Sequence, residues 1–247
     1  LSIGALLPQM HGDLRLMRAV KDEEEIALMK RAQAITDAAF AHMLEFIRPG
    51  LTEKQIKLEL ENFMFENGAD GLAFGSIVAA GPNAANPHAI PSDRPVQKGE
   101  FVLMDYGARY HDYDSDMTRT VAVGEPSTKM REIYDLVQRT HEECAKAVYA
   151  GVDGNEIHEL SRKIIGDAGY GEYYGHGLGH GVGIDIHELP NFGRTHNTVG
   201  EGSVVTIEPG VYLPGEFGVR LEDYGLVTAQ GFVPFTQSPH DLQVIDC

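Results

Sequence analysis

Apolar side chains recur every three or four positions over two pairs of segments, and this spacing predicts two pairs of amphipathic helices. The predicted ranges are 22–47, 52 to about 67, about 128–149, and 154–167. Capping signals fit two of these starts, because Thr52 stands three residues before Gln55 and Asp153 three before Glu156. The acidic run at 22–25 suits the positive N-terminal end of the first helix.

Each helix pair is followed by a segment that predicts a β-hairpin. FVLMDYGARY runs to a turn at 111–114, and SDMTRTVAV returns. SVVTIEPGVYL turns through 214–218, and VRLEDYGLVT returns as the second arm of a slightly longer hairpin. The stretch IDIHEL also alternates like a strand, which predicts one face with Ile184, Ile186 and Glu188 and another with Asp185, His187 and Leu189.

The two halves of the chain resemble each other at a nearly constant offset. IRPGLTEKQI (47–56) is similar to VYAGVDGNEI (148–157), and GEFVLMDYG (99–107) to GSVVTIEPG (202–210). A repeat this long is not a solenoid unit, since those run ~20–50 residues. We therefore predict an old duplication inside one α+β domain, with a curved antiparallel sheet backed by helices.

Composition and charge narrow the classes of partner that the chain is expected to bind. The 247 residues are 43% hydrophobic and carry a formal charge of -17, which disfavours nucleic acid and anionic membranes as partners. No apolar run approaches the ~20 residues of a membrane span. Cys144 and Cys247 lack metal-binding spacing and form no disulfide framework, so a reducing, cytoplasmic location is expected.

Four carboxylates interrupt the predicted hairpins at matched places. They are Asp105 and Asp116 in the first hairpin and Glu208 and Glu222 in the second. One such acid is more often a strand-end or turn residue, but a matched set of four favours a site. Burying an ionised carboxylate costs several kcal/mol, and Arg119 and Arg220 together cannot balance four. Two divalent cations can, and oxygen ligands with one imidazole suit manganese, zinc, cobalt or iron.

A histidine cluster lies between the hairpins, in GHGLGHGVGIDIHELP (175–190). Its histidines are His176, His180 and His187, and one of them should complete the carboxylate cluster. The surrounding glycines argue against a helix and favour an extended stretch packed close to backbone or ligand. His88, in a loop rich in Gly, Pro and Asn, holds roughly the position of His187 in the first half. The alternative for His88 is an ordinary surface histidine.

The segments NPHA, LMDYG, SDMTRT, HGLGHGVGIDIHELP, TIEPGVY and VRLEDYG resemble the motifs of the pita-bread metallopeptidases. In order and spacing they are most similar to the Xaa-Pro peptidases, prolidase and aminopeptidase P. The resemblance implies a pita-bread fold with a catalytic domain over 15–247. Residues 1–14 are then a junction or remnant of an upstream segment, because larger members carry an N-terminal domain.

The resemblance also implies a role for each matching residue. The implied metal ligands are Asp105, Asp116, His180, Glu208 and Glu222, with Asp116 and Glu222 bridging two metals. The implied catalytic residues are His88, His187 and Glu208. The implied substrate-binding or supporting residues are His176, Tyr212 and Arg220.

The implied reaction is hydrolysis of the bond between an N-terminal residue and proline. Two metal ions about 3.5–4 Å apart, with manganese expected and cobalt, zinc or iron as alternatives, would activate a shared water. A metal and a histidine would stabilise the oxyanion, and Glu208 would relay a proton to the proline nitrogen. The implied partner is a small peptide with proline second, and a homodimer stays open.

Three alternatives remain at this point. Methionine aminopeptidases share the fold without an N-terminal domain, although TIEPGVY followed by VRLED resembles the proline-specific branch. A creatinase-type hydrolase is expected to lack metals, and a non-catalytic peptide-binding module on the same fold is expected to lack ligands. The complete ligand set argues against both of these.

Overall fold

A computed structural model of the chain describes residues 14–247, so the predicted junction at 1–14 lies almost wholly outside the described residues. The four predicted helices are present: α2 (Glu23–Phe46), α3 (Glu53–Glu66), α4 (Thr128–Ala147) and α5 (Gly154–Asp167). The capping box of Thr52 and Gln55 is confirmed, because each side chain accepts a hydrogen bond from the other residue's N–H. The side chain of Asp153 instead accepts from the N–H of Asn155, not of Glu156.

The strands of the two halves repeat one arrangement. The first sheet has the order β14–β6–β3–β2, with β2 (Ile77–Ala80), β3 (Glu100–Tyr106), β6 (Met117–Val123) and β14 (Val244–Ile245). The second has the order β13–β12–β9–β7–β8, with β7 (Gly179–Gly181), β8 (Glu188–Phe192), β9 (Val204–Ile207), β12 (Asp223–Thr228) and β13 (Gly231–Pro234). The antiparallel series β2–β3–β6 therefore matches β7–β9–β12, in agreement with the predicted duplication. The short β14 pairs in parallel with β6, which was not predicted.

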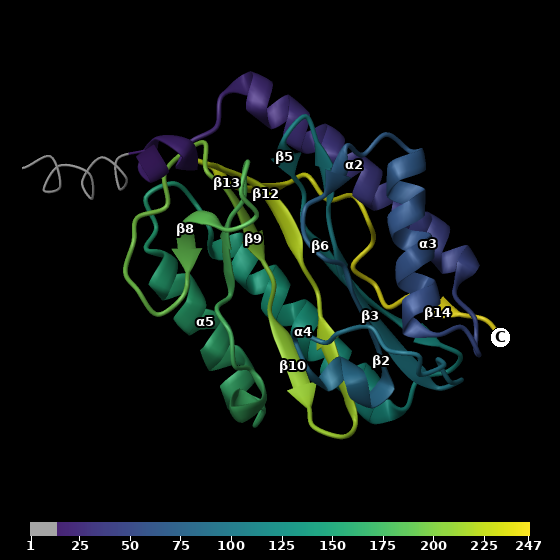
Figure 1. Ribbon diagram of the computed structural model, residues 1–247. Coiled ribbons are helices and arrows are strands. Elements are labelled where there is room, and N and C mark those ends of the chain that lie inside the picture. Colours follow the sequence, from purple (N-terminus) through teal and green to yellow (C-terminus); the bar gives the residue numbers. More distant parts are fainter. Residues whose placement is uncertain (1–13) are drawn as a thin grey trace, which may run out of the picture.

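Each helix pair covers the strands of its own half. Phe40, Met43 and Leu60 of α2 and α3 belong to one buried cluster with strands β3 and β6. Cys144 and Ile157 of α4 and α5 belong to another with β9 and β12. In Figure 1 the α4–α5 pair lies behind the strands, and α2–α3 lies beside the first half. No helix within 14–247 is long and apolar enough to cross a membrane.

The first hairpin forms over the predicted residues, but it is divided between two sheets. β3 and β6 pair over seven residues, with Asp105 opposite Thr118. Beyond them, β4 (Ala108–Tyr110) pairs with β5 (Tyr113–Asp114), and β1 (Gly71–Leu72) pairs with the other edge of β4. His111 and Asp112 have φ of 48° and 68°. Two positive φ values in a two-residue loop suit the twist of a tight hairpin.

The second hairpin is likewise broken into two parts, which the continuous hairpin predicted from the sequence did not include. β9 pairs with β12, whereas β10 (Gly210–Leu213) pairs with β11 (Phe217–Arg220) in a separate two-stranded sheet. The break falls at Glu208–Pro209 on one arm and at Glu222 on the other. Pro209 has no N–H to donate, and the Glu222 N–H bonds to the carbonyl oxygen of Thr118 in the first half instead.

The predicted strand over IDIHEL is also wrong, because 183–187 form bends and β8 begins only at Glu188. The cause is the carboxylate of Glu188, which is buried rather than facing solvent. It binds Lys21 Nζ at 3.0 Å, and Asp185 N donates to it at 3.1 Å. A Cβ on Gly183 would lie 2.6 Å from this carboxylate. The segment therefore curls around a buried acid.

Candidate functional site

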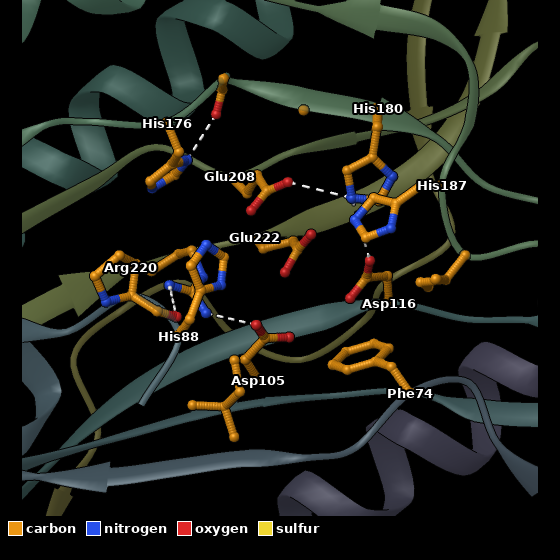
Figure 2. A pocket seen from close by; sticks show the side chains of 15 residues that line it. Phe74, His88, Asp105, Asp116, His176, His180, His187, Glu208, Arg220 and Glu222 are labelled. Atoms are coloured by element: carbon orange, nitrogen blue, oxygen red, sulfur yellow. Dashed lines mark hydrogen bonds and ion pairs between the residues drawn. The ribbon is translucent and has the colours of Figure 1, made fainter. Parts of the chain in front are cut away.

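A cavity of about 300 Å³ opens where the two halves meet. It is lined by side chains from both halves, and every predicted site residue except Tyr212 is among them (Figure 2). Phe74, Ile77 and Ile186 add an apolar wall that the sequence analysis missed. These three carry no motif, and only the tertiary fold brings them together.

The deepest residues of the cavity are acids around one imidazole. Asp116 and Glu222 are 4% and 1% exposed. His180 Nε2 lies 3.7 Å from Asp116 Oδ2 and 3.3 Å from Glu208 Oε1. Ligand atoms of Asp116, His180 and Glu222 all lie within 4.8 Å of one another, a grouping that could hold a metal ion. Asp105 faces this group from below in Figure 2.

Strands and the residues just beside them place these five side chains. Asp105 is in β3, Asp116 precedes β6, His180 is in β7, Glu208 follows β9, and Glu222 precedes β12. The halves are joined here as well, since Thr118 Oγ1 donates to Glu222 Oε2 at 2.6 Å. Carboxylates that leave the strand ladders can therefore converge without breaking the pairing of the central strands.

Two glycines let β7 carry His180 into this group. A Cβ on Gly179 would lie 2.1 Å from the carbonyl oxygen of Thr206, and one on Gly181 would lie 2.2 Å from that of Leu189. This confirms the predicted close packing against backbone. His180 Nδ1 lies 3.1 Å from the carbonyl oxygen of Gly181, an acceptor that keeps the proton on Nδ1 and turns Nε2 toward the acids.

The four acids cannot all be ionised without added positive charge. Burial, and then the charges of Glu222 and Asp105, raise the pKa of Asp116 well above its ordinary value. Burial, and then the charges of Glu208 and Asp105, do the same to the pKa of Glu222. Burial is the largest influence on Glu208 and acts to raise its pKa. The hydrogen bond with His180 and the charges of His180, His176 and Arg220 together outweigh burial and lower that pKa to about 2.

A hydrogen-bonded chain joins the three predicted substrate-binding residues. The hydroxyl of Tyr212 lies 2.8 Å from His176 Nε2 and accepts from Arg220 Nη1 at 2.7 Å. Arg220 also donates to Asp105 through Nη2, and to Thr118 Oγ1 through Nε at 3.0 Å. Tyr212 thus does not line the cavity, but it fixes two residues that do.

His88 and His187 lie at the exposed mouth of the cavity. The His187 ring is 4.3 Å from that of His180, centroid to centroid. Burial, and then the charge of His180, lower the pKa of His187. The two histidines contributed by the two halves therefore flank the opening, as the internal repeat predicts.

Glu53 is a residue that the sequence analysis missed. It is fully buried, and its Oε1 accepts from Ala80 N at 2.7 Å. Its Oε2 accepts from Asn83 Nδ2 at 2.8 Å and from Ser92 N and Oγ at 2.8 and 2.7 Å. Glu53 thereby holds both ends of the loop that carries His88. Because Glu53 is in the first turn of α3, where acids are common, its position in the sequence carries no sign of this role.

The donor set fits divalent metal ions. Asp105 Oδ1 is buried and has no hydrogen-bond partner in the described part of the chain, which leaves an acceptor for a cation. Arg220 supplies one permanent positive charge against four carboxylates. Carboxylate oxygens with one imidazole are ligands that manganese, zinc and similar ions accept.

Comparison with known proteins agrees with this geometry. Residues 27–229 match the model of metallopeptidase family M24. The Xaa-Pro dipeptidase of Pyrococcus horikoshii is 40% identical over 230 residues, which cover 93% of this chain and 66% of that protein. The Xaa-Pro dipeptidase of Lactobacillus delbrueckii is 42% identical, with 93% and 63% covered. The chain therefore spans less than two thirds of the length of these relatives.

Solved structures agree in fold. The X-Pro aminopeptidase of Thermotoga maritima superposes with a TM-score of 0.93 at 40% identity, covering 95% of this chain and 67% of that one. The prolidase of Pyrococcus furiosus gives 0.90 at 39% identity, covering 92% and 68%. The α+β pita-bread fold predicted from the motifs is thus confirmed. Because the family model spans most of the described residues and relatives of this identity share the fold, the chain belongs to metallopeptidase family M24.

Proposed function

We propose that this chain is the catalytic part of a metal-dependent peptidase that cleaves the bond between an N-terminal residue and proline. The observation that carries the proposal is His180 Nε2, directed at Asp116 and Glu208 at the bottom of a cavity that can admit a short peptide. On this proposal residues 15–247 form the catalytic domain. The relatives named as Xaa-Pro dipeptidases support the substrate class.

Two metal ions would be held by Asp105, Asp116, His180, Glu208 and Glu222. Asp116 and Glu222, the most deeply buried of the acids, would bridge them. When bound, such a pair would supply Lewis acidity that lowers the pKa of a water held there toward neutral. Manganese is the expected ion, with cobalt, zinc or iron as alternatives.

The protein groups around the ligands would orient the peptide and move protons. His88 and His187, at the mouth, would donate hydrogen bonds to the carbonyl oxygen as it gains negative charge. Glu208, which pairs with His180, would accept a proton and pass it to the proline nitrogen. The chain from His176 through Tyr212 to Arg220 would fix one side of the cavity.

The apolar wall of Phe74, Ile77 and Ile186 would receive the apolar part of the substrate. A proline ring has no N–H to satisfy once it is in a peptide bond, so an apolar surface can enclose it without leaving a buried donor unpaired. The partner is therefore a small peptide with proline in second position. The homodimer and the cytoplasmic location stay predictions.

The test compares X-Pro dipeptides, X-Pro-Y tripeptides and Met-X peptides as substrates of protein loaded with Mn²⁺. We expect cleavage of the proline peptides and a loss of at least about a hundredfold in kcat on Glu208→Gln, the size of a lost acid–base group. Glu201→Gln, an exposed acid just before β9, is the matched control and should keep full activity. An inactive native protein with every metal, or an active Glu208→Gln protein, would contradict the proposal, and preference for Met-X peptides would favour the methionine aminopeptidase alternative.

A further inference from the structure

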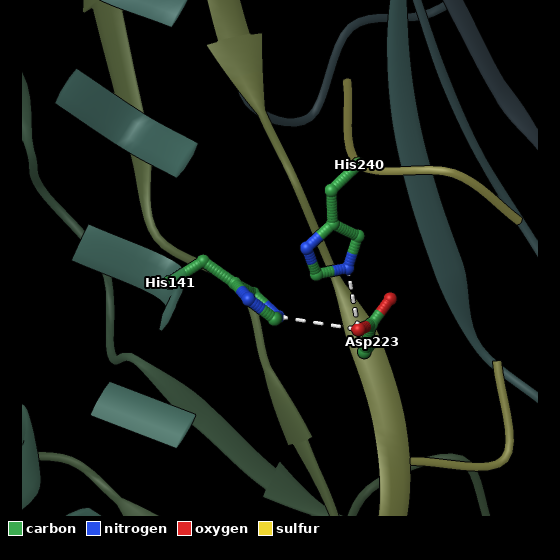
Figure 3. A group of neighbouring side chains, drawn as sticks. All are labelled: His141, Asp223 and His240. Atoms are coloured by element: carbon green, nitrogen blue, oxygen red, sulfur yellow. Dashed lines mark hydrogen bonds and ion pairs between the residues drawn. The ribbon is translucent and has the colours of Figure 1, made fainter. Parts of the chain in front are cut away.

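A second group of metal-ligating side chains lies outside the cavity. His141 of α4, Asp223 of β12 and His240 of the C-terminal segment face one another, and we call them the His141 cluster (Figure 3). Asp223 directly follows Glu222 in the sequence but does not line the cavity. Nothing in the proposed peptidase reaction uses these three residues.

Both imidazoles point at one carboxylate oxygen. His240 Nε2 lies 2.6 Å from Asp223 Oδ2, and His141 Nε2 lies 3.7 Å from the same atom. Three ligand atoms of the cluster lie within 4.8 Å of one another, and the two rings are 4.6 Å apart at an interplanar angle of 87°. Ligand atoms of one tetrahedral ion are about 3–3.5 Å apart when metal–ligand bonds are ~2.0–2.2 Å. Small side-chain adjustments would therefore bring the three ligand atoms to this spacing.

His141 has no hydrogen-bond partner among residues 14–247, although it is only 1% exposed. Neither of its ring nitrogens is satisfied. A buried imidazole without partners is costly and calls for a specific explanation. A cation between the rings would bind Nε2 and account for one of the two nitrogens. Burial lowers the pKa of His141 to about 4, which keeps a lone pair available at neutral pH.

The other two ligands are held in place by the surrounding residues. Arg119 donates to Asp223 Oδ1 at 2.7 Å, so that Oδ2 faces the imidazoles and is hydrogen-bonded to His240 Nε2. The same guanidinium donates to the carbonyl oxygens of Ser238 and Pro239 at 2.8 and 3.0 Å. Tyr134 donates to the carbonyl oxygen of His240 at 2.8 Å. Arg119 and Tyr134 thereby fix the segment that presents His240.

We propose that His141 Nε2, Asp223 Oδ2 and His240 Nε2 bind a third divalent cation of the zinc class, with water as the fourth ligand. Two imidazoles and one carboxylate suit such an ion better than calcium or magnesium, which prefer oxygen ligands. The His240 side chain is 25% exposed, so the ion has a path from solvent. Its bonds would join α4, β12 and the C-terminal segment, and its role is structural. The site does not depend on the peptidase proposal.

The test is zinc stoichiometry, measured by equilibrium dialysis followed by elemental analysis. Native protein should bind one equivalent more than either His141→Leu or His240→Gln protein. His240→Gln changes a partly exposed side chain, so it keeps the test valid if His141→Leu fails to fold. His196→Gln is the matched control, because His196 is a histidine with a largely exposed side chain that pairs with Asp153. It should bind as much zinc as the native protein.

A second measurement separates this site from the cavity. In an Asp116→Asn, His180→Ala protein, which lacks two cavity ligands, the additional zinc equivalent should remain and should still be lost on His240→Gln. Anomalous scattering at the zinc edge should place that ion within bonding distance of Asp223 Oδ2. The proposal is overturned if no zinc is lost on replacing His141 or His240, or if the anomalous map has no peak between them.

Discussion

The two cysteines have the same chemistry in very different surroundings. Cys144 in α4 is fully buried, whereas the C-terminal Cys247 is exposed, and neither forms a disulfide. Burial raises the pKa of the Cys144 thiol to about 12. Because the thiolate is the reactive form, Cys144 should be inert in the folded protein.

We therefore expect a thiol reagent to label one cysteine per native chain, even at about pH 9, and both cysteines after unfolding. Mass spectrometry of the labelled peptides identifies the site. Cys247→Ser is the control and should leave no rapidly labelled thiol. Rapid labelling of Cys144 in the native protein would show that α4 opens far more readily than its packing indicates.

At the residue scale, the carboxylates could be predicted because an acid inside an apolar run conflicts with its surroundings. Asp105 and Glu208 carry that signal in VLMDY and VTIEP. Glu53 does not, since an acid in the first turn of a helix is expected for other reasons. Its four donors come from residues 80, 83 and 92, and no local pattern could have brought them together.

At the scale of elements, the loop carrying His88 depends on that one buried acid. Glu53→Gln keeps the size of the side chain but puts an NH₂ group against donors, so at least one donor loses its acceptor. We expect a loss of about 1–3 kcal/mol in the free energy of unfolding, and faster hydrogen exchange at the amides of Ala80 and Ser92. Exchange measured by mass spectrometry and denaturant unfolding check both.

Glu23→Gln is the matched control for this prediction. Glu23 is also in the first turn of a helix, but it is exposed. The Glu23→Gln substitution should change the free energy of unfolding by no more than about 0.5 kcal/mol. If Glu53→Gln protein exchanged no faster at these amides than Glu23→Gln protein, Glu53 would not be the anchor of the loop.

Helices were the elements most fully predicted, because their periodicity and caps are local. The second hairpin was predicted only in part, since its break depends on the bond from Glu222 N to Thr118, more than 100 residues away. The bends at 183–187 have a similar cause. The alternation in IDIHEL could not show that the Glu188 carboxylate binds Lys21, which lies 167 residues earlier in the chain.

At the scale of the whole molecule, the crowded acids link metal binding to stability. We expect Mn²⁺ added to metal-free protein to raise the melting temperature, because an ion at a hundred times its Kd contributes about 2.7 kcal/mol. Asp116→Asn should abolish most of this rise. It should not destabilise the metal-free protein, since it removes an acid whose pKa burial and neighbouring charges raise.

Calorimetry with and without chelator measures both effects. Asp93→Asn, at an exposed acid that pairs with Lys54 on the surface, is the control and should keep the full response to Mn²⁺. A metal-free Asp116→Asn protein that melts well below the native one would mean that Asp116 is a structural acid rather than one held for a cation.

The division of the cavity between the halves has a consequence for how such a chain could arise. The first half supplies Asp105, Asp116 and His88, and the second supplies His180, Glu208, Glu222 and His187. An unduplicated ancestor carrying one set would have no complete centre of its own. Two copies facing each other across a twofold axis would assemble one. Fusion of the two genes would then let each copy diverge, so that a symmetric cluster of acids could acquire its single imidazole ligand from one half only.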